Sequence, residues 1–206
     1  MIQSFLTGFF LGLSLIVAIG AQNTFVLRQG ILGQHVFYVS LFCALSDALL
    51  IIIGVAGISF FLNNFISHNL NFLFGLSAVW LAGYGLIRLR SALKSNNTIE
   101  IERSTLKGLF PTISMAAALT FLNPHVYLDT MILIGSISQQ FSGFYKFTFA
   151  LGAILASFVF FFSLAYGAKI LSPLMQRQSA WRTLDCLIAL IMFIIAFQLA
   201  SAGNWL

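Results

Sequence analysis

Long apolar runs dominate this chain and limit it to one class of fold. Each run has about the 20 residues that a helix needs to cross the hydrocarbon core of a bilayer. The runs cover residues 4–27, 36–62, 69–87, 109–137, 144–171 and 183–203. Backbone polar groups cannot go unpaired in lipid, and the runs lack the alternation of a transmembrane β-strand. The sequence therefore predicts an all-α integral membrane protein with about six transmembrane helices.

The composition agrees with this fold class and leaves no room for a second domain. Of the 206 residues, 60% are hydrophobic and 7% are charged, whereas a soluble domain has about 25% charged residues. The one sizeable polar stretch, residues 88–108, has two glutamates among basic residues and no apolar core of its own. We therefore expect a single transmembrane domain over residues 1–206, with residues 88–108 as a connecting loop.

The distribution of Lys and Arg predicts the topology. With six crossings, the loops after the first, third and fifth helices share one side of the membrane and hold nine of the ten basic residues, whereas the other side has only Lys146. Because basic residues stay in the cytoplasm, both termini are expected outside. A re-entrant segment among the first three runs would instead give five crossings and a cytoplasmic N-terminus. The net charge of +5 then reflects topology beside anionic lipid, and no nucleic-acid partner is expected.

An internal similarity suggests two related halves. Residues 8–30 match residues 108–130 at six of 23 positions, where biased composition alone would give about two matches. Halves of three helices each, over residues 1–87 and 109–206, must have opposite orientations because three is an odd number. Such inverted repeats place their binding site near the midplane, on interrupted helices. The similarity thus predicts interruptions in the first and fourth helices, with chance similarity as the alternative.

Helix-breaking and polar residues mark both of these places. Pro124 lacks an N–H, so the carbonyl four residues earlier loses its helical partner, and Asn123 is pushed away from α geometry. In the first half, Gly20 loosens the helix beside the amides of Gln22 and Asn23. A simple packing kink is the alternative, since glycine and proline are common in membrane helices. Their occurrence at equivalent places in both halves favours a substrate site.

Two aspartates lie deep within apolar runs. Asp47 and Asp129 each cost about 2.5 to 3.5 kcal/mol to insert at the centre of a membrane helix. No Lys or Arg is expected deep enough to neutralise both, and Arg28 is the nearest candidate. We therefore expect a cationic ligand or a proton as their partner, with a buried structural ion pair as the alternative. Asp185, three residues after Arg182, is expected at the membrane interface.

Two neighbours of Pro124 are further candidates for a functional role. His125 can relay protons or serve as a structural hydrogen-bonding group. Tyr127 can place its ring under a cation or its hydroxyl on a carboxylate, although packing is the commoner role of a membrane tyrosine. No G-x-S-x-G, H-E-x-x-H or C-x-x-C pattern occurs, so we expect no enzyme, no metal site and no cofactor. The lack of a Walker motif excludes ATP drive within this chain.

Three segments resemble the LysE-type family of bacterial basic amino acid exporters, especially its arginine-exporter branch: Gly20 to Val26, the Ser46-Asp47 helix and Leu122 to Asp129. The resemblance covers nearly the whole chain and implies a multi-pass carrier of the bacterial inner membrane that exports arginine, lysine or related cationic amino acids. It implies these substrate-binding positions: Gln22, Asn23, Asp47, Asn123, Pro124, Tyr127 and Asp129. The family usually has proline where this chain has Ala21, which predicts a less sharp break in the first helix.

The residues and the resemblance both indicate a cationic amino acid as the substrate. Such a ligand needs donors for its carboxylate, which amides at the two interruptions supply, and anions for its cationic groups, which Asp47 and Asp129 supply. Moving +1 charge outward against an inside-negative potential costs about 2.3 kcal/mol per 100 mV. We therefore expect antiport with a proton taken up by one of these aspartates or by His125. A cation or metal channel is the alternative.

The sequence does not distinguish arginine from lysine, since both need two anions and differ in the planar fork of the guanidinium. It also leaves the oligomeric state open, including a homo-oligomer.

Overall fold

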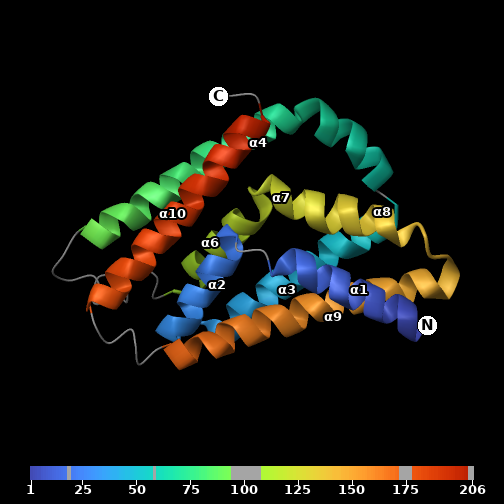
Figure 1. Ribbon diagram of the computed structural model, residues 1–206, viewed down its shortest axis with the longest axis horizontal. Helices are drawn as coiled ribbons and strands as arrows, with labels where there is room; N and C mark the ends of the chain where they lie inside the picture. The colour runs from blue at the N-terminus through green and yellow to red at the C-terminus, as the bar shows by residue number, and fades with distance from the viewer. Residues whose placement is uncertain (18–19, 58, 94–107, 172–177, 204–206) are drawn as a thin grey trace.

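A computed structural model describes residues 1–17, 20–57, 59–93, 108–171 and 178–203, with the backbone alone at residues 59–70, 73, 125 and 178 (Figure 1). Every regular element in this described part is a helix. In chain order the elements are α1 (Ile2–Ile16), α2 (Ala21–Leu32), α3 (Val36–Val55), α4 (Ser59–Leu93), α6 (Leu109–Phe121), α7 (Pro124–Val126), η1 (Tyr127–Leu133), α8 (Ile134–Ser138), α9 (Gly143–Gly167), η2 (Ala168–Leu171) and α10 (Gln178–Ala202). The predicted all-α fold is confirmed.

Several helices are long and apolar enough to cross a membrane. Three single helices of the described part have both the length and the hydropathy of a membrane span, over Val36–Val55, Gly143–Leu171 and Ser179–Ala202. The bent pair α1 and α2 gives a fourth candidate span, and Leu109–Phe121 and Tyr127–Ser138 are shorter apolar helices. The integral membrane class is therefore confirmed, while the count of six crossings and the opposite orientation of the two halves stay predictions.

The helices pack in two groups (Figure 1). α4 and α10 run side by side, and α1 and α3 pack along α9. α2 lies between these groups and contacts α3, α6 and α9 as well as α10. The interrupted first segment therefore links both groups of helices.

The boundary between α3 and α4 differs from the prediction, which separates these helices at residues 63–68. α3 ends at Val55 and α4 begins at Ser59. Gly57 has a φ of 86°, a left-handed conformation that glycine adopts readily and that commonly ends a helix. At its other end α4 continues to Leu93, so Arg88 and Arg90 lie in a helix and not in the expected loop. Residues 94–107 of that loop lie outside the described part.

The first predicted interruption is present and is sharper than the alanine at position 21 suggests. α1 ends at Ile16, α2 begins at Ala21, and the two helices are bent by 83°. Gly20 caps α2 with an extended backbone (φ −117°, ψ 178°), so the helix begins there without a proline. The Asn23 Nδ2 donates a 2.7 Å hydrogen bond to the Ile16 carbonyl, one of the groups that a helix end leaves without a helical partner. The Asn23 side chain therefore stabilises the break.

The second interruption lies where Pro124 predicts it. α6 ends at Phe121, α7 begins at Pro124, and the π-helix η1 follows. Two carbonyls of the break accept side-chain hydrogen bonds, because the Ser77 hydroxyl of α4 donates to Leu122 and the Tyr127 hydroxyl donates to Phe121 over 2.9 Å. Short π-helical segments are rare and frequently occur at functional sites. The break is thus held from α4 and from η1.

Small residues let α3 approach the second broken helix closely. A Cβ on Gly54 would lie 2.5 Å from the Met131 carbonyl oxygen of η1, and a Cβ on Gly135 of α8 would lie 2.7 Å from the Gly54 carbonyl oxygen. Both distances are too short for a real Cβ contact. Membrane helices often pack through such small residues because lipid provides no hydrophobic drive for their association. This contact fixes η1, which carries Asp129, against α3, which carries Asp47.

Gly54→Ala is expected to destabilise the fold by about 1–3 kcal/mol, because the added methyl group pushes the backbones of α3 and η1 apart. Gly83→Ala in α4 is the matched control, since a Cβ there meets nothing within 4 Å. Both purified variants are compared with the wild type by thermal unfolding in one detergent. Equal melting temperatures for all three proteins would contradict the close contact of α3 with η1.

Candidate functional site

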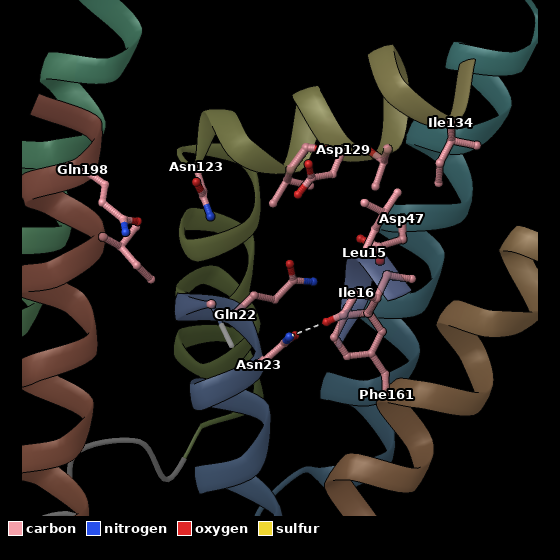
Figure 2. A pocket seen from close by; sticks show the side chains of 14 residues that line it. Leu15, Ile16, Gln22, Asn23, Asp47, Asn123, Asp129, Ile134, Phe161 and Gln198 are labelled. Atoms are coloured by element: carbon pink, nitrogen blue, oxygen red, sulfur yellow. Dashed lines mark hydrogen bonds between the residues drawn. The ribbon is translucent and has the colours of Figure 1, made fainter. Parts of the chain in front are cut away.

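A cavity of about 230 Å³ lies where the two interrupted helices meet α3 and α10 (Figure 2). Its lining residues are Leu15, Ile16, Gly20, Gln22, Asn23, Asp47, Asn123, Val126, Asp129, Thr130, Ile134, Phe161, Ile195 and Gln198. Residues of both predicted interruptions and both deep aspartates therefore share one cavity.

The cavity brings together five of the seven predicted binding residues: Gln22, Asn23, Asp47, Asn123 and Asp129. Pro124 and Tyr127 are not among the lining residues. Pro124 begins α7 beside them, and the Tyr127 hydroxyl donates to the Phe121 carbonyl instead of reaching a carboxylate. The side chain of His125 lies outside the described part of the chain. Tyr127 and Pro124 thus take part in the helix break rather than in the cavity wall.

Asp47 is held by a partner that sequence reasoning missed. The residue is 3% exposed, and its Oδ2 accepts a 2.9 Å hydrogen bond from the hydroxyl of buried Ser157 in α9. The two residues are 110 positions apart, so no spacing rule connects them. From α2, Gln22 approaches both Asp47 and Cys43.

Two acidic side chains, Asp47 and Asp129, line the cavity. Asp129 lies in η1 and is partly buried, and Figure 2 shows it with Asp47 in the wall that η1 and α3 form. No Lys or Arg side chain is among the described residues that line this cavity. The described part of the chain also has no group of three or more His, Cys, Asp and Glu side chains that could hold a metal ion.

The opposite wall comes from α10 and contains a second residue that the prediction missed. Gln198 and Ile195 line the cavity, and Gln198 extends from α10 toward Asn123 (Figure 2). Gln198 follows twelve consecutive apolar residues, 186–197. An amide in apolar surroundings is costly unless it finds polar partners. The isolated position of this glutamine in an apolar run could therefore have identified it from the sequence as a candidate site residue.

Asp185 is fully buried among the helices, and its predicted place at the membrane interface stays a prediction. Its Oδ1 lies 3.7 Å from an Arg28 nitrogen and 3.9 Å from an Arg88 nitrogen, which links α10 to α2 and α4. The Arg28 guanidinium lies 5.6 Å from the centre of the Trp181 ring, and that of Arg88 lies 4.9 Å from the Tyr84 ring. The position of an acid near a helix start does not reveal the neighbouring helices that cover it. Arg28 therefore pairs with an acid outside the cavity.

Comparisons with known proteins agree with these features. The family model described as "LysE type translocator" matches residues 13–203. The chain is 40% identical over 206 residues to the putative amino-acid transporter YggA of Aeromonas salmonicida, with 98% of each chain covered. It is 41% identical over 204 residues to the arginine exporter protein ArgO of Salmonella enteritidis, with 98% of this chain and 96% of the exporter covered. No solved structure matches it significantly.

Proposed function

Because the chain belongs to the LysE type translocator family, we propose that its cavity binds arginine, and also lysine, during export from the cell. Family membership makes the chain a multi-pass amino acid transporter of the bacterial inner membrane and not an enzyme. The observation that carries the proposal is a cavity with two carboxylates and no Lys or Arg among the described residues that line it. Such a cavity attracts a ligand whose side chain and α-amino group are both cationic.

The proposed complex uses both kinds of polar group in the cavity. Asp47 and Asp129 accept hydrogen bonds from the cationic groups of the amino acid. The amides of Gln22, Asn23 and Asn123 donate to its carboxylate, together with N–H groups in the first turn of α2. Each end of the substrate thereby meets a group of the complementary kind.

Three further residues position this site without lining it. Ser157 holds the Asp47 carboxylate through its 2.9 Å hydrogen bond. Pro124 prevents α6 from continuing, and Tyr127 stabilises the resulting break through the Phe121 carbonyl. In this proposal Pro124 and Tyr127, which the resemblance implies as binding residues, act on the backbone that carries Asn123 and Asp129.

Inverted repeats account for the placement of the cavity. In this proposal the two halves, residues 1–87 and 109–206, each contribute one interrupted helix. Asn23 and Asn123, which the internal similarity pairs, both line the cavity. The first half then continues to Leu93, because α4 extends that far. A site between two such halves can be reached alternately from either side when the halves move against each other.

The coupling proposed for export is antiport with a proton. Asp47 and Asp129 are acids in the cavity that can hold either the substrate or a proton, and His125 is a candidate for proton relay. Inside-out vesicles with an acidic lumen should therefore accumulate labelled arginine, and a protonophore should abolish this uptake. Vesicles prepared from cells without the gene are the control. Uptake that ignores the pH gradient would contradict proton coupling.

The proposed substrate is tested by efflux of labelled arginine and lysine from cells with and without the gene. A carrier should give saturable efflux that unlabelled substrate inhibits, and it should confer resistance to the toxic arginine analogue canavanine. Equal efflux in both strains would contradict the proposal. A cation or metal channel would instead give an ionic conductance that does not saturate with amino acid.

A further inference from the structure

We infer that Gln198 of α10 binds the α-carboxylate of the transported amino acid, and that it thereby selects amino acids over the corresponding decarboxylated amines. This inference rests on the proposed function, because it assigns one end of the proposed substrate to one wall of the cavity.

The two walls of the cavity differ in chemistry. α3 and η1 supply the carboxylates of Asp47 and Asp129, whereas the residues that α10 supplies are Ile195 and Gln198. Figure 2 shows Gln198 reaching toward Asn123, away from the Asp47 side of the cavity. Two primary amides therefore face each other at the end of the cavity remote from Asp47. Each amide has two N–H donors, and a substrate carboxylate needs such donors without a neighbouring negative charge.

The amides of α2 are differently placed. Gln22 approaches Asp47, and the Asn23 Nδ2 donates to the Ile16 carbonyl over 2.7 Å, as the dashed line in Figure 2 marks. These groups lie beside the acidic wall and the helix break. Gln198 thus adds a donor on the α10 side of the cavity, opposite the acids, to the amides that the proposed complex already places on the carboxylate. A substrate whose cationic groups lie at Asp47 and Asp129 points its carboxylate toward α10.

Packing of α10 does not require a glutamine at this position. Many side chains buried between α4 and α10 are apolar, among them Met192 and Leu199. Ile195 and Gln198, three residues apart, lie on the face of α10 that lines the cavity. Gln198 is exposed and lines the cavity, so its amide is open to a ligand there.

The test compares arginine with agmatine, which has the same guanidinium and an amine but no carboxylate. Binding of both to purified protein is measured by calorimetry. Gln198→Ala should raise the Kd for arginine about tenfold and leave the Kd for agmatine as in the wild type. Gln198→Glu should reverse the preference toward agmatine, because its carboxylate repels that of arginine and attracts the amine. Asp129→Asn should weaken both ligands.

Phe197→Ala is the matched control, since Phe197 precedes Gln198 on α10, is 64% exposed and does not line the cavity. The ratio of the two affinities is measured within one sample, so it does not depend on the folded fraction. If the alanine variant does not fold, Gln198→Met keeps the shape of the side chain and is expected to give the same change. An unchanged ratio in the Gln198 variants would overturn the inference while wild-type binding of arginine upholds the proposed function. Failure of the wild type to bind arginine would overturn both.

Discussion

Asp47→Asn and Asp129→Asn are each expected to abolish arginine export while the protein remains inserted in the membrane. Hydrogen bonds to a charged group contribute about 1.5–3 kcal/mol, so loss of one carboxylate should lower the affinity about ten- to hundredfold. Each change also removes an acid that can exchange a proton for the substrate. Asparagine keeps the shape of aspartate, and its carbonyl oxygen can still accept the hydrogen bond from Ser157 at position 47.

The measurement is efflux of labelled arginine from cells with equal amounts of each variant in the membrane fraction. Asp47→Glu and Asp129→Glu are the matched controls, because they restore the charge on a longer side chain and should retain part of the activity. Wild-type efflux by both asparagine variants would show that these carboxylates do not bind the substrate.

Asp185→Asn is expected to have the largest effect on stability among the variants considered. Asp185 lies fully buried between Arg28 and Arg88. Loss of one partner from a buried ion pair costs about 3–5 kcal/mol, because a charge is left in the interior without its counter-ion. In this variant, Arg28 of α2 and Arg88 of α4 would lose the carboxylate of α10 that lies between them. We expect little folded protein in detergent and a strongly lowered melting temperature.

Arg90→Gln is the matched control for this experiment, since Arg90 is exposed on α4 two residues beyond Arg88. It removes a charge from the same helix and should leave the melting temperature close to that of the wild type. A triple variant with Arg28→Met, Arg88→Met and Asp185→Leu should recover stability, because apolar residues of similar volume often replace buried ion pairs without loss. Wild-type stability of Asp185→Asn would mean that the ion pairs contribute nothing to the fold.

The features that the sequence predicted correctly depend on residues close together in the chain. The length of an apolar run indicates a membrane helix, and Pro124 ends α6 because it lacks a backbone donor. Gly20 caps the start of α2 in a similarly local way, and the bend of 83° arises even with alanine at the next position. The deep aspartates were also recognisable, because an acid inside an apolar run is costly wherever the neighbouring helices lie.

The features that the sequence did not predict depend on contacts between distant segments. Ser157 meets Asp47 because α9 packs against α3, and nothing within either helix indicates this pairing. Asp185 is buried because α2 and α4 bring arginines to it, whereas hydropathy along α10 describes only the composition of that helix. Gln198 was visible as an isolated amide, but its role in the cavity wall depends on where α10 lies relative to Asn123.

The hydrogen bond from Asn23 to the Ile16 carbonyl gives the cavity a mechanical connection to the first helix. One amide both lines the cavity and closes the end of α1. A ligand that accepts a hydrogen bond from the Asn23 Nδ2 competes with the Ile16 carbonyl for this donor. The affinity of the ligand therefore depends on how strongly this hydrogen bond stabilises the bend between α1 and α2. α1 packs along α9, so any change in the angle of the bend also changes the contact between these two helices.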